Sequence, residues 1–297
     1  MDATEASWHG PENPAIRKTR ATGLRILRRL GSFLLLHTGS TGRYWEVDAL
    51  RGLAVAMMVI YHLTFDLVLL GYWQVSLYES PWQPSSVAIA GLFILVAGAS
   101  LILNRARVTR RASEQGAASA RDARLFRRTL VRGLKLLGWG MLISLAARVY
   151  MGKMVIVFGI LHFAGTATIL AYPFLGLRWA NLVLGAVIII VSRWLSHLPV
   201  EHPALLILGV GAITTAQLDY LPLFPWFGVM LLGVFLGQVL YPDGVRRLVL
   251  PDLGARQGIR QLVWVGRHSL LVYLVHQPIL LAFLTLAKFV SLGPGAG

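Results

Sequence analysis

Three polar residues lie in one long apolar stretch near the start of the chain, at spacings that place them on one side of a helix. Arg51 and His62 are eleven residues apart, and Asp66 follows His62 at i+4. Eleven residues make about 3.1 helical turns and about 16 Å of rise, so the three side chains share nearly one face. The stripe carries a cation at one membrane edge, an imidazole about half a bilayer deep and a carboxylate one turn beyond it.

This stripe suits a long anionic donor that enters from the side of Arg51. Arg51 could hold a phosphate, and His62 could act as base or nucleophile at the reactive end. Asp66 could orient the imidazole and stabilise its protonated form. The competing interpretation is that Arg51 reaches lipid phosphates and that the other two residues bond neighbouring helices. Two titratable groups one turn apart in a span are costly, which favours a function for His62 and Asp66.

Two further histidines lie inside apolar stretches. His162 follows Phe158-Gly-Ile-Leu, and His276 lies near the middle of its stretch, beside Gln277 and a proline that frees a backbone carbonyl. Three mid-membrane histidines could bind zinc or copper. No pair has the i, i+4 spacing of a helical metal motif, so we predict no metal site.

Other polar residues stand where apolar stretches begin or end. Arg267, Arg132 and Lys135 are candidate phosphate ligands at the inner ends, although contact with lipid headgroups is the alternative for Arg267. Asp219 and Trp226 lie at the outer entrance of another stretch, where aromatic residues usually anchor a helix. Asp219, Trp226 and Gln277 are the candidate contacts for a polar acceptor.

Composition sets the class of protein. The chain has 297 residues, 56% of them hydrophobic and 14% charged, against about 25% charged in soluble domains. There is no cysteine, which excludes disulfides and thiolate metal sites. The net charge of +15 is explained better by membrane topology than by nucleic acid. No Walker loop, Rossmann fingerprint or Gly-x-Ser-x-Gly elbow is evident, so soluble nucleotide hydrolysis is not predicted.

The apolar stretches predict an all-α, polytopic transmembrane helix bundle, because lipid-exposed backbone must satisfy its own hydrogen bonds. A span needs about 20 residues. Seven stretches meet this, and the shorter segment 203–216 could re-enter or form part of an eighth span. The seven are roughly 49–71, 85–103, 130–149, 154–173, 180–197, 223–241 and 264–287.

The charges predict the orientation. With a cytoplasmic N-terminus and seven crossings, 24 of the 28 Lys and Arg residues lie inside, which is a positive-inside pattern. The chain is therefore predicted to be a multi-pass inner-membrane protein. The basic loop 104–128 is rich in Ala, Ser and Gln, and its middle is expected to be mobile. Residues 1–42 are predicted to form a cytoplasmic tail in which 20–37 make a basic amphipathic helix on the membrane surface.

Several motifs resemble one family. The stretch Asp48-Ala-Leu-Arg51-Gly52 through Tyr61-His62-Leu-Thr-Phe-Asp66 resembles the first span of bacterial proteins with the heparan-alpha-glucosaminide N-acetyltransferase catalytic domain. The resemblance covers about residues 43–290, and Arg51 with His62 also resembles the Arg and His pair of the acyltransferase-3 family, which O-acylates cell-surface sugars. Later signatures follow in the same order: Phe158-Gly-Ile-Leu-His162, Pro222-Leu-Phe-Pro-Trp-Phe-Gly228, Gly266-Arg-His-Ser-Leu and His276-Gln-Pro278.

The resemblance implies a transmembrane acyltransferase domain over 43–297, in a bacterial inner membrane. It would move an acetyl group from cytoplasmic acetyl-CoA, as co-substrate, to an amine or hydroxyl of an outer-side sugar or envelope glycan. By analogy with the acyltransferase-3 pattern, His62 is the catalytic histidine. The lysosomal enzyme is understood to place its active histidine in the outer loop after the first span. The corresponding loop here, 74–86, has no histidine, so the expectation rests on His62, His162 and His276.

Two other functions remain open on sequence grounds. Buried His and Asp chains also serve as proton relays, which would suit a proton-coupled exporter of a small envelope precursor, although no internal repeat of the transporter kind is evident. A non-catalytic membrane scaffold is the third reading. The expected partners are the lipid bilayer, acetyl-CoA and a glycan acceptor, without nucleic acid. The acceptor, the acyl chain length, an acetyl-histidine intermediate and a homodimeric state are left open.

Overall fold

The structure is a computed structural model that describes residues 43–77, 79–151, 156–198, 202–211 and 219–292. Within these ranges the regular elements are helices, and the β-type pairing is one isolated bridge between Phe158 and Tyr220. The all-α prediction is therefore confirmed. The expected tail and surface helix, within residues 1–42, lie outside the described residues.

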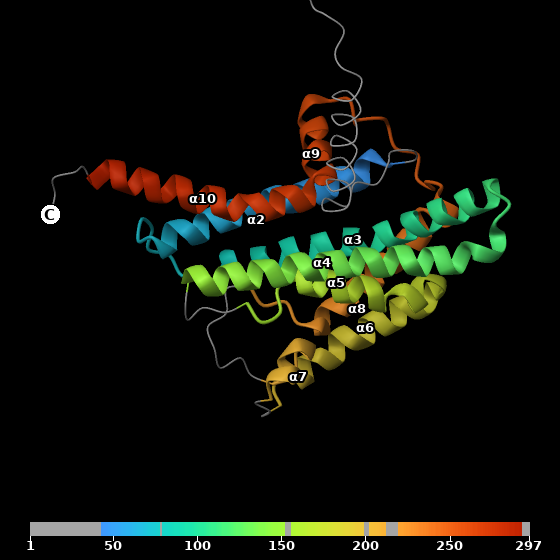
Figure 1. Cartoon of the computed structure of the whole chain (residues 1–297), viewed down its shortest axis with the longest axis horizontal. Helices are drawn as coiled ribbons and strands as arrows, with labels where there is room; N and C mark the ends of the chain where they lie inside the picture. The colour runs from blue at the N-terminus through green and yellow to red at the C-terminus, as the bar shows by residue number, and fades with distance from the viewer. Residues whose placement is uncertain (1–42, 78, 152–155, 199–201, 212–218, 293–297) are drawn as a thin grey trace, which may run out of the picture. The chain divides into compact units, whose positions relative to one another are not determined.

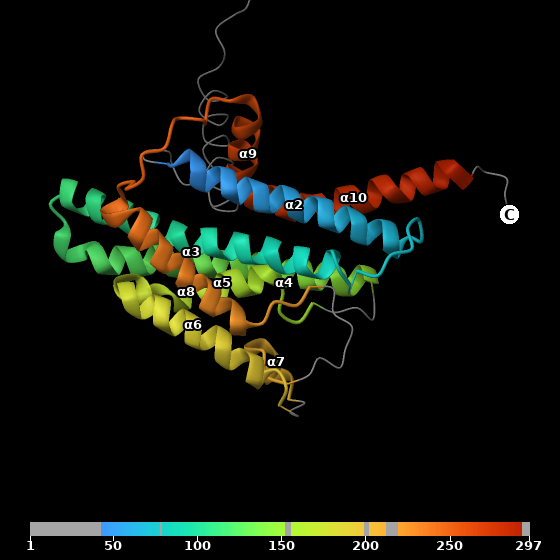
Figure 2. The same cartoon turned by 180° about the vertical axis from the view of Figure 1, so that it is seen from behind.

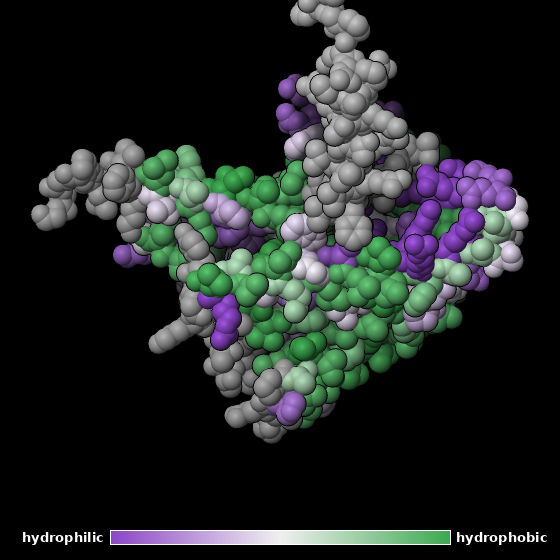
Figure 3. All heavy atoms as spheres, in the orientation of Figure 1, coloured by the Kyte–Doolittle hydropathy of each residue, from purple (hydrophilic) through white to green (hydrophobic). Residues whose placement is uncertain are grey.

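Six of the described helices are long and apolar enough to cross a membrane. They are α2 (Trp45–Leu69), α3 (Trp82–Glu114), α4 (Arg121–Met151), α6 (Arg178–Leu195), α8 (Leu223–Leu240) and α10 (Ser269–Leu292). Several expose stripes of large apolar side chains, as lipid-facing helices do, and Figure 3 shows hydrophobic surface along their length. Exposed examples are Met141, Leu145 and Val149 on α4, Val183, Val187, Ile190 and Trp194 on α6, and Ile279, Phe283 and Leu286 on α10.

Glycines set how closely the helices pack. Helix α8 lies against both α3 and α6 (Figure 1, Figure 2). A Cβ on Gly98 of α3 would lie 2.4 Å from the Met230 carbonyl oxygen, and one on Gly233 of α8 would lie 2.3 Å from the Leu95 oxygen. Small residues allow such backbone contact in membrane bundles, where apolar burial alone does not drive helices together.

The stretch 154–173, expected to be a full span, contains only the 11-residue helix α5 (Ile160–Leu170). At 1.5 Å per residue it is about 16 Å long, roughly half a bilayer. A Cβ on Gly140 of α4 would lie 3.1 Å from the His162 ring, and one on Gly133 would lie 2.4 Å from Ile169. Helix α5 therefore starts beside the middle of α4 and runs antiparallel to it. The predicted count of seven spans is not confirmed.

The segment 203–216 also differs from a span in its described part. Helix α7 (Pro203–Leu208) has six residues and ends at Gly209, which has a left-handed φ of 84°. Proline at the first helical position and glycine just past the last one are standard helix boundaries. Helix α7 is therefore too short to cross a membrane.

The assignment of 104–128 as a loop was wrong for most of that segment, while the mobility of its middle stays a prediction. Helix α3 continues to Glu114, and α4 begins at Arg121 after the 3-10 turn η1 (Ala118–Ala120). Alanine and arginine are good helix formers, so both helices extend beyond their apolar parts. A loop assignment based on hydropathy alone misses such polar extensions.

One end of the bundle, which we call the basic end, consists of the start of α2, the end of α3 and the start of α4. Figure 3 shows the hydrophilic residues gathered where α3 turns into α4. The Tyr44 hydroxyl donates to the Gly244 carbonyl at 2.7 Å, and Arg246 pairs with Glu46 at 3.3 Å. Burial, assisted by the Glu46 carboxylate, raises the pKa of the Tyr241 phenol, which donates to Glu46 at 3.1 Å. These bonds hold the residues after α8 against the start of α2.

The predicted span 264–287 is divided in the structure. Helix α9 (Gln257–Arg267) ends at His268, whose φ and ψ of −107° and 20° interrupt the helix before α10 begins. Helix α9 packs on α2 at a steep angle to α10 (Figure 1). A Cβ on Gly52 would lie 1.9 Å from the Leu262 oxygen, and one on Gly266 would lie 1.8 Å from the Asp48 oxygen. Glycine at both positions therefore allows α9 to bring Arg267 to α2.

Candidate functional site

Helix α2 joins two groups of polar residues. At the basic end lies the arginine cluster, which we define as Arg43, Arg51, Arg107 and Arg132 with the carboxylate Asp48. Further along α2 lies the histidine cluster, which we define as His62, Asp66, His276 and Gln277. Arg51 and His62 are separated by the eleven residues that the sequence indicates.

Arg51 is held in a fixed orientation. Its Nη1 donates to Asp48 Oδ1 at 2.9 Å, and its Nη2 donates to the Ser100 hydroxyl of α3 at 2.5 Å. The second oxygen of Asp48 accepts from Nε of Arg267 at 3.3 Å. Asp48 is buried, and a buried carboxylate needs such partners. The structure thus brings Arg51 and Arg267 together through Asp48, a residue absent from the predicted site.

Two further arginines approach Arg51 from α3 and α4. Arg132 lies within electrostatic range of Arg43, Arg51 and Arg107. Arg107 lies within range of Arg43, Arg51 and Asp48. The Nε atoms of Arg107 and Arg132 are buried and have no hydrogen-bond partner in the described part of the chain. Buried donors normally find partners, and guanidinium groups match phosphate geometry, so this cluster is suited to an anion.

Of the predicted phosphate ligands, Arg132 lies within electrostatic range of Arg51, and Lys135 lies three residues further along α4, partly buried. Their role in phosphate binding stays a prediction. Arg107 was not predicted. It follows Ser100 by seven residues, two helical turns, and so shares its face. That signal was hidden because the predicted span ended at residue 103.

The histidine cluster joins α2 to α10. The rings of His62 and His276 are edge-to-face with centroids 5.0 Å apart. Asp66 is fully buried, and its Oδ1 accepts from the Gln277 side-chain amide at 2.7 Å. Four predicted site residues, from two segments about 210 positions apart, therefore meet at one place.

The partner of His62 is different from the one expected. Its Nδ1 bonds the Met58 carbonyl oxygen at 2.9 Å, one turn back on α2. Asp66 instead holds Gln277, although its charge remains within electrostatic range of His62. The backbone carbonyl at i−4 is thus the group that orients the imidazole.

The backbone contacts assign the tautomers of the three histidines. A carbonyl oxygen only accepts, so the Nδ1 atoms of His62 and His276, which contact Met58 O at 2.9 Å and Tyr273 O at 2.7 Å, carry hydrogen. Their Nε2 atoms therefore hold the free lone pairs. His162 has the opposite arrangement, because its Nδ1 accepts from the Gly159 N–H at 3.3 Å. In neutral His162 the hydrogen is on Nε2, which makes this atom a donor.

Three buried acceptor atoms in the histidine cluster have no hydrogen-bond partner among the described residues. They are Asp66 Oδ2, His276 Nε2 and Gln277 Oε1. Such atoms are costly to bury and call for a ligand or water that donates. Among the described residues no group of three or more His, Cys, Asp or Glu side chains could hold a metal ion.

His162 and Asp219 border this cluster. Asp219 Oδ2 accepts from the first amide of α5, the Ile160 N–H, at 2.9 Å, and its charge lies within range of both His62 and His162. Tyr273 of α10 lies within electrostatic range of the same carboxylate. Tyr273 was not predicted, although it lies three residues before His276 and thus on the same face of the helix.

Trp226 stays a predicted acceptor contact. Its side chain packs against the hydrophobic core, with Gly91 of α3 beside its ring. Aromatic side chains at a helix start usually have such an anchoring role.

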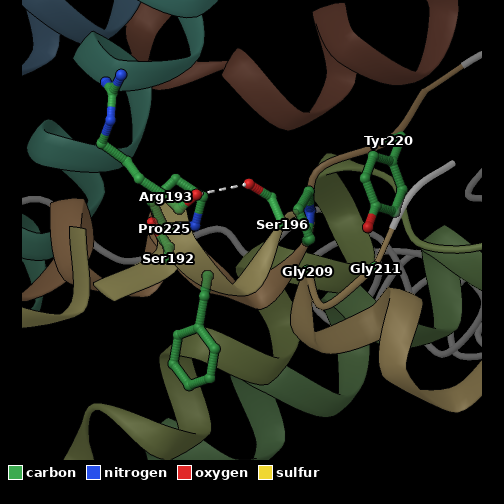
Figure 4. Close-up of a pocket in the computed structure, with 9 residues that line it drawn as sticks. Ser192, Arg193, Ser196, Gly209, Gly211, Tyr220 and Pro225 are labelled. Atoms are coloured by element: carbon green, nitrogen blue, oxygen red, sulfur yellow. Dashed lines mark hydrogen bonds between the residues drawn. The ribbon is translucent and has the colours of Figure 1, made fainter. Parts of the chain in front are cut away.

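A cavity of about 230 Å³ lies between α6, α7 and α8 (Figure 4). The Tyr220 hydroxyl at its wall donates to the Leu206 carbonyl at 2.6 Å, and Ser196 donates to the Arg193 carbonyl at 3.2 Å. None of the predicted site residues lines it. Unpaired buried groups, which mark the two clusters, are the stronger sign of a site than this mostly apolar hollow.

Comparison with known families finds one match, described as "Heparan-alpha-glucosaminide N-acetyltransferase, catalytic", over residues 43–278. No curated protein and no solved structure matches the chain. The matched region covers well over half of the sequence and contains every residue of both clusters. The chain therefore belongs to the heparan-alpha-glucosaminide N-acetyltransferase catalytic-domain family, a family of membrane acetyltransferases.

Proposed function

We propose that the protein transfers an acetyl group from acetyl-CoA, bound at the basic end, to an amine or hydroxyl of a sugar or envelope glycan on the other side of a bacterial inner membrane. The observation that carries this proposal is that two clusters with unpaired buried polar atoms lie beside two positions along α2. Buried guanidinium donors without partners lie at one end of α2, and buried acceptors without partners lie beside His62. A donor with phosphates at one end and a thioester at the other suits this arrangement.

The arginine cluster would bind the phosphates of acetyl-CoA. Arg107 and Arg132 offer unpaired Nε donors, while Asp48 fixes Arg51 and Arg267 beside them. Burial in the bundle reduces screening by solvent, which strengthens a charge-assisted bond. The positive-inside pattern supports a cytoplasmic basic end, where acetyl-CoA is available.

The histidines would carry out the transfer. His62 Nε2 takes the proton from the acceptor N–H or O–H as the acceptor attacks the thioester carbonyl carbon. The His162 Nε2–H donates to the carbonyl oxygen as charge develops on it. The carbon–sulfur bond then breaks, the acetyl group stays on the acceptor, and CoA thiolate receives the proton from His62. The unpaired hydrogen-bond acceptor atoms of Asp66, His276 and Gln277 would bind other N–H or O–H groups of the compound that receives the acetyl group.

The test is titration of acetyl-CoA into the detergent-purified protein by calorimetry, with ATP and free phosphate as competitors. Arg51→Ala and Arg132→Gln should lose saturable binding. Arg178→Gln is the matched control, because the Arg178 guanidinium stacks on Trp179, 5.8 Å from the ring centre, outside the cluster. Absence of binding to the unaltered protein at millimolar acetyl-CoA would contradict the proposal and favour a proton-coupled exporter that uses the buried histidines as a relay.

A further inference from the structure

Helix α9 meets α2 at the depth where the hydrocarbon core of a bilayer would end. A Cβ on Gly52 of α2 would lie 1.9 Å from the Leu262 oxygen of α9, so the two backbones touch at this position. Beyond the other end of α2, Tyr72 and Trp73 are exposed, as aromatic residues at a membrane surface are. Gly52 and Tyr72 are twenty residues apart, about 30 Å of helix, which matches the thickness of the core. The contact between α9 and α2 therefore lies at headgroup level.

The direction of α9 differs from that of the spanning helices. Helix α9 ends at Arg267, and α10 begins at Ser269 and runs at a steep angle to it (Figure 1). Because α10 is long and apolar enough to cross the membrane, α9 runs along the membrane surface. A short helix in this orientation contacts the bundle with one face and leaves the other to the headgroup region.

The outward face of α9 combines a cation with an aromatic ring. Val263 and Gly266 are buried, whereas Arg260 and Trp264 are exposed, Trp264 by 57%. Arg260 and Trp264 are four residues apart, so they are neighbours on one face of the helix. An arginine that reaches lipid phosphates and a tryptophan that lies among headgroups are the usual residues at this depth.

The segment that leads into α9 exposes apolar side chains. Val249 is 100% exposed, and Val245 and Leu248 are more than half exposed. The segment is nevertheless held in place, because Arg246 pairs with Glu46 at the start of α2 at 3.3 Å. Three exposed aliphatic side chains on a segment that is held in this way indicate a surface that an apolar partner covers.

The charges indicate the chemistry of this partner. Residues 245–267 contain five arginines and one carboxylate, that of Asp252. Two of the arginines pair with carboxylates of α2. The other three are exposed and take part in no ion pair within the described part of the chain; they are Arg247, Arg256 and Arg260. A partner that combines apolar chains with negative charge suits this surface, and a leaflet that contains anionic lipids has both.

We propose that the outward face of α9 and the segment 245–256, together called the α9 surface, bind the anionic headgroups of the lipid leaflet at the basic end. The exposed aliphatic side chains enter the boundary of the acyl chains, Trp264 lies among the headgroups, and the three exposed arginines hold lipid phosphates. The α9 surface is separate from the arginine cluster, whose unpaired donors are buried. Its binding of lipid therefore does not depend on acetyl transfer.

The first arm of the test measures contact with lipid. Because the chain has no cysteine, Val249→Cys takes a single NBD fluorophore. Ser113→Cys, at an exposed polar position near the end of α3, is the matched control. Both proteins are placed in nanodiscs of phosphatidylcholine and phosphatidylglycerol. Iodide should quench the label at residue 249 at least about threefold less than the label at residue 113, and brominated lipid should quench the label at residue 249 alone.

Two results of this arm would overturn the proposal. Equal iodide quenching at the two positions would mean that the segment before α9 lies in water. A label at residue 249 that resists both iodide and brominated lipid would mean that protein, such as a second copy of the chain, covers the surface.

The second arm measures the preference for negative charge. Phosphatidylglycerol is titrated into the detergent-purified protein labelled at residue 249, with phosphatidylcholine as the comparison, and NBD emission reports binding. The triple variant Arg247→Gln, Arg256→Gln, Arg260→Gln should weaken phosphatidylglycerol binding by about a hundredfold, which is about fivefold for each cation. Binding of phosphatidylcholine should not change.

A second triple variant controls for net charge. Arg110→Gln, Arg121→Gln, Arg124→Gln removes the same charge from the turn between α3 and α4, where each of these arginines contacts a neighbouring polar side chain. It should change phosphatidylglycerol binding by less than about threefold, since solvent screens distant charges. Equal losses in the two triple variants would overturn the proposal, as would equal binding of the two lipids when all the arginines are present.

Discussion

The arginine cluster and the histidine cluster are unsatisfied in opposite ways. The arginine cluster has buried donors without acceptors, at Nε of Arg107 and Arg132. The histidine cluster has buried acceptors without donors, on Asp66, His276 and Gln277. The difference indicates two ligands rather than one, an anion at the basic end and an N–H or O–H compound beside His62. Transfer between an anionic donor and a polar acceptor requires such a pair of sites.

The largest expected effect separates chemistry from donor binding. His62→Ala should lower turnover by about a hundred- to ten-thousandfold, the contribution of a general base, and should leave calorimetric binding of acetyl-CoA unchanged. His202→Ala, which removes an exposed histidine at the start of α7, is the control. Normal turnover in His62→Ala would remove the histidine cluster from the reaction.

The next effect tests acetyl-CoA binding at the arginine cluster. Arg107→Gln removes one guanidinium from the anion site and should weaken acetyl-CoA binding by about ten- to a hundredfold, since bonds to charged groups contribute about 1.5–3 kcal/mol. The turnover at saturating donor should stay near that of the unaltered protein. A lower kcat at unchanged affinity would mean that the two clusters are not separate sites.

A smaller effect concerns the contact that builds the basic end. Gly52→Ala places a Cβ 1.9 Å from the Leu262 oxygen and should destabilise the protein by about 1–3 kcal/mol. Because α9 then moves from α2, Arg267 leaves Asp48 and donor affinity falls as well. Gly138→Ala, whose Cβ meets nothing within 4 Å, should leave the melting temperature and the affinity unchanged. Equal melting temperatures of the two variants would show that α9 is not fixed by this contact.

The smallest effect tests a hydrogen bond that stabilises the fold and lies outside both clusters. Tyr44→Phe removes the 2.7 Å bond to the Gly244 carbonyl and should cost about 0.5–1.5 kcal/mol of stability. The hydroxyl takes no part in either cluster, so kcat and donor affinity should remain. A change in kcat without a change in melting temperature would assign Tyr44 to the site.

Part of the site was predictable because one helix, α2, contributes residues to both clusters. Arg51 and His62 are eleven residues apart and Asp66 follows His62 by four, which places all three on one face of α2. The cost of polar side chains inside apolar stretches indicated His162 and His276. Gln277 was predicted as an acceptor contact, yet its bond to Asp66 was not. The spacing of residues along a helix predicts which face a side chain lies on and how far along the axis it is. It does not predict which other helix packs against that face.

The sequence by itself determined the membrane class, the all-α fold, the family and the division of α2 into a cationic end and an imidazole. Hydropathy, charge distribution and short motifs decide these, and all three are local properties of the chain. Only the tertiary structure decided that α5 is a half-length helix, that Arg107 and Asp48 complete the arginine cluster, and that Asp219 accepts from the first amide of α5. These features depend on backbone contacts at glycines and on hydrogen bonds across more than 50 positions of sequence, which no single helix pattern contains.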